Sequence, residues 1–570
     1  MSSSDTNVAL RRLQGVAKHL GDDDSPAHFE NLRIHRAQGQ APCTTPLNPI
    51  RWLLRSAMVY KNKVAMIDGD RQFTYQALAE RVHRLANVLI DQYSVQPGDR
   101  VAILCQNVPA FLESKYAVPA AGGVLVPLNT RLAAAEIDYV ISHSGASVLV
   151  VQEDLLSRVS PKARQQVKMI TVQPTTNTTL CAYEQLIQSC TKPRLSWNAL
   201  PLTQDENALL SINYTSGSTG RPKGVMVSYR SCYMMAISMC MQARITPETV
   251  YLWTLPMFHC NGWNFPWALV SMGATQVMLN GIDYTLIWKM LKTHGITHYC
   301  GAPTVQNEIC NHKDAVRLDR RVLTFSGGAA LSSTRIKRLH DLNIEPTQVY
   351  GLTETMGPCV LSYDNVAIAQ YPKDQHLTLA ARIGYGTAIC DEMRVLDKET
   401  ALDVPPDGKT VGEICITGNL VMLGYYNDPE ETAKAFRHGV FWTGDLGVRH
   451  PDGSVEIVDR SKDVVVSGGE NISSIEVENV VVQMDAVSEC AIIAGPDEKW
   501  GERPYAFVIL KQGHSLTEAA VIEHCRKNLA GYKCPSKVIF TNNIPKTSTG
   551  KYQKFVLREQ LWKSYSKRVN

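Results

Sequence analysis

The chain has 570 residues, of which 44% are hydrophobic and 20% are charged, and its formal net charge at pH 7 is +4. This composition is typical of a globular protein, and the length allows roughly three to four domains. So small a charge gives no reason to expect nucleic acid or a membrane surface as a partner. No apolar run reaches the length of a membrane span, because the longest, near 117–128, is interrupted by proline and glycine.

The 15 cysteines are scattered along the chain, and no two of them form a C-x-x-C motif. An odd number without such spacing favours free, mostly buried thiols in a reducing compartment over a disulfide framework or a zinc site. The polar N-terminus lacks the apolar segment of a secretory signal.

Residues 1–45 are polar and carry three consecutive aspartates at 22–24, so we expect a partly disordered leader. Within it, Arg12-Leu13 and His19-Leu20 are separated by five residues. Positions seven apart share one face of a helix. The pattern resembles a type-2 peroxisomal targeting signal, which an import receptor reads. The resemblance implies a peroxisomal location; a chance match in an amphipathic leader, and a cytoplasmic protein, is the alternative.

Beyond the leader, helix-like and strand-like segments alternate. Helical spacing predicts helices over 75–93 and 133–144, and apolar runs predict buried strands over 100–105, 147–151, 274–279, 322–325 and 348–350. Alternation of this kind predicts an α/β fold with largely parallel sheets. After about residue 385 the chain becomes rich in strands, as at 413–417 and 454–458.

These patterns predict three parts. A leader at 1–45 precedes a large domain at 46–460, which contains mixed, largely parallel sheets and a β-rich subdomain at about 385–458. A small, mobile α+β domain follows at 461–570.

The most informative segment reads Tyr-Thr-Ser-Gly-Ser-Thr-Gly-Arg-Pro-Lys-Gly-Val at 214–225, directly after the apolar run 209–212. A strand that opens into such a loop can surround phosphate oxygens with backbone N–H groups and hydroxyls, while Lys223 supplies positive charge. Glycine allows the backbone to approach a ligand closely. The spacing differs from the common G-x-x-x-x-G-K-[ST] phosphate loop. A plain flexible loop is the alternative for this composition alone.

Further motifs follow in order along the chain, and each combines glycine with polar or charged residues. They are Leu-Pro-Met-Phe-His-Cys-Asn-Gly-Trp at 255–263, Ser-Gly-Gly-Ala-Ala at 326–330, Tyr-Gly-Leu-Thr-Glu-Thr at 350–355, Trp-Thr-Gly-Asp at 442–445, Asp-Arg-Ser-Lys-Asp at 459–463, Ser-Gly-Gly-Glu-Asn at 467–471 and Pro-Lys-Thr-Ser-Thr-Gly-Lys at 545–551. Together with 214–225, this series resembles the adenylate-forming superfamily, which includes acyl-CoA synthetases, over about residues 70–555.

The resemblance implies an acyl-CoA ligase with ATP, Mg²⁺ and CoA as cofactors. A carboxylate attacks the α-phosphate of ATP to give an acyl-adenylate and pyrophosphate, and the thiol of CoA then displaces AMP. Both reactants of the first step are anions, so the site must gather positive charge and hydrogen-bond donors around the phosphorus.

The resemblance also implies a set of ATP contacts, in which Asp445 accepts the ribose hydroxyls and Tyr350 stacks on adenine. The set comprises Thr215, Ser216, Gly217, Ser218, Thr219, Gly220, Lys223, Gly328, Ala329, Tyr350, Gly351, Asp445 and Arg460. Thr353 is expected to touch the α-phosphate and Glu354 to hold Mg²⁺, which needs few protein ligands. The structural alternatives are a solvated acid for Glu354, a turn residue for Asp445, a core aromatic for Tyr350, and an ion pair with Asp459 or Asp463 for Arg460.

The C-terminal motifs carry the remaining expected roles. Lys551 is expected to bridge the carboxylate and the α-phosphate, and Lys462 occupies the hinge between the domains. Gly468 and Gly469 are expected to line the tunnel for CoA, whose phosphates meet Lys533 or Arg503. Ordinary surface residues are the alternative for Lys551, Lys533 and Arg503.

The motif at 255–263 concerns the acid. His259 is expected in the catalytic site as a wall residue near the carboxylate, with Trp263 and Gly327 in the acyl pocket. Cys260 beside His259 raises the idea of a Cys–His nucleophile. Neighbours on a strand point to opposite faces, which argues against it.

No acidic residue obviously pairs with a substrate ammonium, which disfavours amino acids, and no carrier segment follows the lysine motif. With the N-terminal signal, the chain resembles fungal peroxisomal acyl-CoA ligases of secondary metabolism, including the siderophore-pathway mevalonyl-CoA ligase. This implies a short- or medium-chain acid or a hydroxy acid. The alternatives are an adenylating enzyme that serves an acceptor other than CoA, and a non-catalytic protein that binds acyl-AMP.

Overall fold

The structure is a computed structural model that describes residues 45–173, 181–215, 222–328, 331, 333–390, 392–467, 470–497, 499–547 and 552–563. Several predicted residues lie outside these ranges: Arg12, Leu13, His19, Leu20, Ser216, Gly217, Ser218, Thr219, Gly220, Ala329, Gly468, Gly469 and Lys551. The elements below all belong to one compact unit, Leu47–Asn570.

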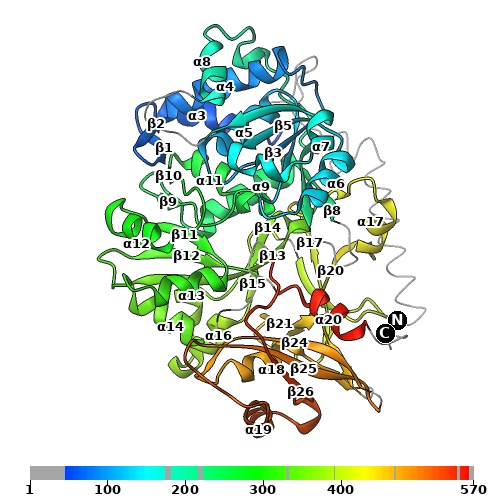
Figure 1. Cartoon of the computed structure of the whole chain (residues 1–570). Coiled ribbons are helices and arrows are strands. Elements are labelled where there is room, and N and C mark those ends of the chain that lie inside the picture. Colours follow the sequence, from blue (N-terminus) through cyan, green and yellow to red (C-terminus); the bar gives the residue numbers. More distant parts are fainter. Residues whose placement is uncertain are drawn as a thin grey trace, which may run out of the picture. The chain divides into compact units, whose positions relative to one another are not determined.

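The first large sheet has seven strands (Figure 1). Their order is β18 (Gly424–Tyr425), β8 (Lys223–Ser228), β7 (Leu209–Thr215), β4 (Val124–Pro127), β3 (Arg100–Leu104), β5 (Ala146–Gln152) and β6 (Lys168–Val172). The strands from β7 to β6 are parallel, and β8 and β18 extend this sheet in antiparallel pairing. The two described ends of the Gly/Ser/Thr segment, Thr215 on β7 and Lys223 on β8, therefore lie near one edge of the sheet.

The second large sheet has nine strands. Their order is β15 (Tyr385–Gly386), β14 (Gly357–Leu361), β13 (Ile344–Leu352), β12 (Val322–Ser326), β11 (His298–Gly301), β9 (Val250–Leu252), β10 (Thr275–Val277), β1 (Val64–Asp68) and β2 (Arg71–Thr74). The strands from β13 to β1 are parallel. The predicted adenine and phosphate motifs follow β12 and end β13, so they lie at the carboxyl ends of neighbouring strands, where α/β sheets bind ligands.

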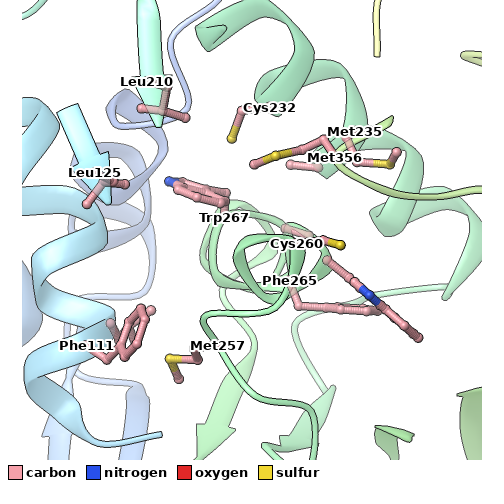
Figure 2. Packing of buried hydrophobic residues seen from close by; sticks show 14 of the residues in the cluster. Phe111, Leu125, Leu210, Cys232, Met235, Met257, Cys260, Phe265, Trp267 and Met356 are labelled. Atoms are coloured by element: carbon pink, nitrogen blue, oxygen red, sulfur yellow. The ribbon is translucent and has the colours of Figure 1, made fainter. Parts of the chain in front are cut away.

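Helices accompany both sheets. They are α3 (Arg51–Val59), α4 (Tyr75–Asp91), α5 (Pro109–Ala120), α6 (Ala134–Ser144), α7 (Pro161–Gln166), α8 (Ala182–Ser189), α9 (Tyr229–Gln242), α10 (Cys260–Trp263), α11 (Phe265–Met272), α12 (Tyr284–Thr293), α13 (Pro303–Asn311), α14 (Ser333–Asp341), α15 (Asn365–Ile368) and α16 (His376–Ala381). Short 3₁₀ helices are η1 (Glu153–Arg158), η2 (Trp197–Ala199), η3 (Thr353–Thr355) and η4 (Lys373–Gln375). Every residue of α5 is buried, and this helix shares one apolar cluster with α9 and α11. Figure 2 shows part of that cluster around Trp267.

A third sheet is wholly antiparallel. It contains β16 (Glu392–Leu396), β17 (Gly412–Thr417), β20 (Val440–Arg449) and β19 (Phe436–Arg437), and β21 (Val455–Arg460) pairs with β20. Helix α17 (Pro429–Ala435) precedes β19. The prediction of a strand-rich segment after residue 385 is confirmed.

The C-terminal segment forms its own sheet and core (Figure 1). The strands are β23 (Glu470–Ile472), β22 (Val465–Ser467), β25 (Gly501–Leu510), β24 (Val487–Asp497) and β26 (Lys537–Phe540), with helices α18 (Ser474–Val481), α19 (Glu518–Asn528), η5 (Gly531–Lys533) and α20 (Lys554–Trp562). The predicted fold class, a large α/β part with a small α+β part, is confirmed. The domain boundaries themselves stay predictions.

Candidate functional site

The β7–β8 hairpin presents Lys223 at the base of the Gly/Ser/Thr loop. Thr215 pairs with Lys223 in the strand register, just before the segment that lies outside the described residues. The Lys223 ammonium forms an ion pair with Glu431 on α17 and lies 4.9 Å from the ring centroid of Tyr425. Hydrogen bonds from Lys223 and Lys434 lower the pKa of Glu431. The lysine that was predicted to face phosphate is thus held in place by a carboxylate.

Glu354, on η3, lies beside this lysine. Its Oε1 accepts a 2.9 Å hydrogen bond from the Tyr425 hydroxyl, and its backbone carbonyl accepts one of 2.8 Å from Met422 N. Burial and the nearby Glu354 carboxylate raise the pKa of Tyr425, so this hydroxyl remains a donor. Tyr425 connects Glu354 to Lys223, which brings two predicted site residues from separate motifs together.

The carboxylate of Glu354 suits Mg²⁺, because this ion takes most of its ligands from phosphate oxygens and water. Across the part of the chain that the structure describes, no three His, Cys, Asp or Glu side chains gather into a metal cluster. A single carboxylate near Lys223 suits a magnesium ion that takes its other ligands from a nucleotide and water, so Glu354 fits the role, which stays a prediction.

Tyr350, Asp445 and Arg460 form a second cluster. The Tyr350 hydroxyl donates a 2.8 Å hydrogen bond to Asp445 Oδ2, and Arg460 Nε lies 3.3 Å from Asp445 Oδ1. Asp445 and Arg460 are also direct partners across β20 and β21. Asp445 is 5% exposed. Its negative charge raises the pKa of Arg460, whereas burial alone would lower that pKa. The ion pair of Arg460 is with Asp445, not with the predicted alternatives: Asp463 pairs with Arg558, and Asp459 accepts from the backbone N–H groups of Ser474 and Arg460.

The Asp445 carboxylate can still accept hydrogen bonds from a ligand. A carboxylate accepts about four hydrogen bonds, and Tyr350 and Arg460 together use part of that capacity. Burial, followed by the Asp445 charge, raises the pKa of Tyr350 well above its ordinary value, so the phenol keeps its proton. A diol such as the ribose hydroxyls has the donors that Asp445 still lacks.

Two glycines shape the backbone between these clusters. A side chain at Gly351 would place its Cβ 2.0 Å from the carbonyl oxygen of Gly357, a clash that only a backbone shift could relieve. Gly328 has a φ of +96°, in the region that favours glycine. Both positions were predicted from the motifs. Glycine is needed at Gly351 because of a close backbone contact and is favoured at Gly328 because of its positive φ.

The predicted acyl-pocket residues Trp263 and Gly327 touch. A Cβ at Gly327 would lie 3.1 Å from the Trp263 ring, and one at Gly357 would lie 3.4 Å from Trp263 Cα. Trp263 is 5% exposed. The indole therefore forms a wall against the ends of β12 and β14.

The segment that carries Trp263 is not a strand. Positive φ angles occur at five consecutive residues: Cys260, Asn261, Gly262, Trp263 and Asn264. Each non-glycine residue in this conformation costs about 1–2 kcal/mol. We call residues 260–264, which include the short element α10, the left-handed turn.

One prediction about this segment is wrong. His259 and Cys260 do not point to opposite faces, because Cys260 already belongs to the left-handed turn; its Sγ lies 3.9 Å from His259 Nε2. The same sulfur lies 3.5 Å from Thr353 Oγ1. The turn thus adjoins the predicted phosphate-contacting threonine, while the catalytic role of His259 stays a prediction.

Lys533 and Arg503, the two residues predicted near the CoA phosphates, already have partners within the chain. Lys533 Nζ donates to both carboxylate oxygens of Glu476 at 2.8 Å, and Arg503 lies 3.5 Å from the Cys534 carbonyl oxygen. Burial, with the Arg460 charge, lowers the pKa of Lys462. The contacts of Lys533 and Arg503 with CoA, and the hinge role of Lys462, stay predictions.

The sequence reasoning missed several residues that build the site. Tyr425 and Glu431 follow no motif and gave no signal. Lys115 did carry one: it is a lysine inside the largely apolar run 109–120, where a charge needs an explanation.

Residues 53–426 match the family model for AMP-binding enzymes, and residues 476–551 match that of the AMP-binding enzyme C-terminal domain. The peroxisomal acetate/butyrate–CoA ligase AAE7 of Arabidopsis thaliana is 38% identical over 542 residues, covering 90% of this chain and 94% of that protein. The 4-hydroxybutyrate–CoA ligase 2 of Metallosphaera sedula is 37% identical over 527 residues, covering 90% and 94%.

Among solved structures, ATP-bound MatB from Rhodopseudomonas palustris is similar to this chain with a TM-score of 0.80 and 28% identity, covering 92% of this chain and 100% of that one. Sequence and fold thus agree over nearly the whole length. The chain belongs to the AMP-binding enzyme family, among its AMP-forming acyl-CoA ligases.

Proposed function

We propose that this ligase activates a short- or medium-chain carboxylic acid or hydroxy acid, and that Tyr350, Asp445 and Arg460 hold the nucleotide. The cluster of these three residues is the observation that carries the proposal, because a buried carboxylate with a retained donor and a fixed cation matches a ribose beside a phosphate. The same reaction class uses ATP, Mg²⁺ and CoA.

The charges of the site suit the first half-reaction. Glu354 contacts the Tyr425 hydroxyl, and Lys223 lies over the Tyr425 ring. The charge of Asp445, and to a lesser extent that of Glu354, raises the pKa of Arg460, so two cations lie near the carboxylate that we propose for Mg²⁺. Thr353 Oγ1 faces the left-handed turn and can donate to the α-phosphate. Preorganised donors of this kind stabilise charge that develops at the phosphorus. Lys551, from the C-terminal lysine motif, would complete the charge balance.

The size of the acid follows from Trp263. Its ring packs against the position of Gly327 and is almost fully buried, so it fills space that a long acyl chain needs. The two relatives named above act on acetate or butyrate and on 4-hydroxybutyrate, as their names state. A small acid, with or without a hydroxyl, agrees with both observations, and a hydroxy acid of secondary metabolism or siderophore synthesis belongs to this proposal.

The second half-reaction concerns the C-terminal part. We place the large domain at 46–460, with its β-rich subdomain at about 385–458, and the small domain at 461–570, with Lys462 at the hinge. Rotation there would remove Lys551 and admit CoA beside Gly468 and Gly469, with Lys533 near its phosphates. Release of Lys533 from Glu476 is then part of CoA binding.

We propose a peroxisomal location, which the leader and the name of one relative support. The name of the Arabidopsis ligase places that protein in peroxisomes. Arg12, Leu13, His19 and Leu20 would direct this chain there through an import receptor. Residues 1–45 fused to a fluorescent protein should accumulate in peroxisomes, and the Arg12→Ala/His19→Ala fusion should stay in the cytosol. Within the described ranges, no helix combines the length and apolar character needed to cross a bilayer.

ATP–pyrophosphate exchange across a panel of acids, with and without CoA, tests the function. The proposal predicts exchange that is strongest for small aliphatic or hydroxy acids, and acyl-CoA formation only when CoA is added. Exchange without any thioester product would favour an acceptor other than CoA. Binding of acyl-AMP without exchange would favour a non-catalytic protein.

A further inference from the structure

We infer that Lys115, on α5, is a positioning residue that clamps the left-handed turn and thereby sets which acids the site accepts. The inference rests on the proposed role of Trp263 as the wall of the acyl pocket. It assigns a function to a buried cation that the nucleotide chemistry does not use.

Lys115 is fully buried. Its Nζ donates to the backbone oxygens of Met257 at 3.1 Å and Asn261 at 3.2 Å, and also to Asn261 Oδ1. In the described part of the chain, these acceptors are all uncharged. A buried lysine is normally paired with a carboxylate. Here the ammonium instead donates its hydrogen bonds to Met257 and Asn261, within one short segment, which points to a structural role for that segment.

The surroundings of the ammonium favour a fixed position. Nζ lies 4.8 Å from the ring centroid of Phe111 and 5.3 Å from that of Trp267, on neighbouring elements of the core shown in Figure 2. Burial lowers the pKa of Lys115 well below its ordinary value. However, three oxygen acceptors match the three N–H donors of the charged form, and aromatic faces attract a cation.

The turn that Lys115 holds needs such support. Non-glycine residues with positive φ persist only where the surrounding structure over-determines them, and they concentrate at functional sites. Asn261 Nδ2 donates to Ser211 Oγ at 3.1 Å, and Asn264 Nδ2 donates to the Met356 carbonyl at 2.7 Å. Side chains thus tie the turn to β7 and to the residue before β14. Lys115 contacts the turn twice, through the backbone oxygen and Oδ1 of Asn261, and contacts Met257 just before it.

The clamp reaches the acyl pocket through Trp263. Asn261, which accepts twice from Lys115, lies two residues before Trp263 in the same turn. The Trp263 ring lies against Gly327, with no room for a side chain between them. A change in the turn therefore moves the wall that faces the acid, whereas Asp445 and Arg460 lie on a different sheet and keep their geometry.

The test is Lys115→Met, which keeps an unbranched side chain but removes the donors. We expect the KM for the preferred acid to rise by about 10- to 100-fold, the scale of a small misplacement of substrate, and the preference among acids to flatten. The KM for ATP should change by less than about twofold. The protein is also labelled with 5-fluorotryptophan, which gives one ¹⁹F signal for each of its nine tryptophans. The Trp263 signal, assigned with Trp263→Phe, should shift or split.

Lys63→Met is the matched control. Lys63 Nζ also donates to a backbone carbonyl, that of Gly273, at 2.6 Å, and burial lowers its pKa as well. It has no contact with the left-handed turn among its hydrogen bonds. This control should lose stability while the Trp263 signal and the KM for the acid stay unchanged.

The outcomes distinguish a failure of the Lys115 clamp from a failure of the proposed function. If wild type forms acyl-CoA from small acids but Lys115→Met keeps the Trp263 signal and the acid preference, the clamp is disproved and the proposed function stands. If wild type shows no acid-dependent exchange, the proposed function fails on its own. If Lys115→Met does not fold, Asn261→Ala removes one acceptor and should shift the Trp263 signal in the same direction; an unchanged signal there also overturns the inference.

Discussion

The nucleotide cluster (Tyr350, Asp445 and Arg460) and the acyl wall (Trp263 against Gly327) are built in different ways. Tyr350, Asp445 and Arg460 are charged or polar side chains that contact one another from regular strands. The wall depends on backbone in the left-handed turn, held by buried polar groups such as Lys115 that lie far away in the sequence. In our proposal, chemistry common to the reaction class is carried by side chains, and the choice of acid by a supported backbone.

This difference gives each region its own kind of sensitivity. On the proposed function, replacing a side chain in the nucleotide cluster should remove a contact with ATP directly. Replacing a support of the wall shifts a surface and changes selectivity more than rate. The variants below separate these effects.

The largest loss is expected for Lys551→Ala, on the nucleotide side of the comparison. Adenylation should fall by about 100-fold or more, the scale of losing a donor that stabilises the transition state. ATP–pyrophosphate exchange measures it. Lys546→Ala is the matched control, because Lys546 belongs to the same motif but pairs with Glu489 at 2.6 Å. Near wild-type exchange in Lys551→Ala would remove the lysine from the first half-reaction.

Asp445→Asn is expected to act next most strongly. The loss of hydrogen bonds to a charged group costs about 1.5–3 kcal/mol, so kcat/KM for ATP should fall by about 10- to 150-fold. The KM for the acid should hardly change, since Asp445 lies in the other region. Initial rates at varied ATP and varied acid give both values. An effect confined to the KM for the acid would show that the two regions are not separate.

Trp263→Ala should mainly change selectivity. Removal of the indole opens space beside Gly327 for a longer acyl chain. In a hydrophobic pocket, one methylene changes kcat/KM by about 10-fold or more. We expect the ratio of kcat/KM for hexanoate over butyrate to rise by about that factor, with the KM for ATP unchanged. The same ratio in Tyr425→Phe, on the nucleotide side, should stay at the wild-type value. An unchanged ratio in Trp263→Ala would mean that another surface limits chain length.

The smallest effect concerns a polar cluster that belongs to neither region. Burial alone would raise the pKa of Asp452, but hydrogen bonds from Tyr363 and Ser454 lower it to about 2. A carboxyl with a depressed pKa in the folded state stabilises the protein above its unfolded value of about 3.9, and this contribution disappears as pH falls through about 2. Asp452→Asn should cost about 1–2 kcal/mol at pH 7, measured by urea unfolding, with no change in kcat. Between pH 5 and 3, wild type should lose stability more steeply than this variant; equal slopes would contradict the assignment.

The sequence predicts side chains of both regions, Trp263 and Gly327 included, but not the backbone that supports the acyl wall. Motifs predict Tyr350, Asp445 and Arg460 because reactive side chains and glycines occur at recognisable spacing. Alternation of apolar runs likewise predicts β3, β5 and α4 closely, since periodicity follows from burial. The left-handed turn was misread as extended, because no local rule reports a backbone that distant residues enforce. Lys115 supplies that enforcement from 142 to 146 residues away, and only the fold brings it to the turn.

The most direct test of the account is a crystal structure with a non-hydrolysable sulfamoyl analogue of butyryl-adenylate. The account predicts the ribose hydroxyls on Asp445, the sulfamoyl group beside Thr353 and the Gly/Ser/Thr loop, and the butyryl chain ending against Trp263 and Gly327. A ribose away from Asp445, or an acyl chain that leaves Trp263 untouched, would contradict it.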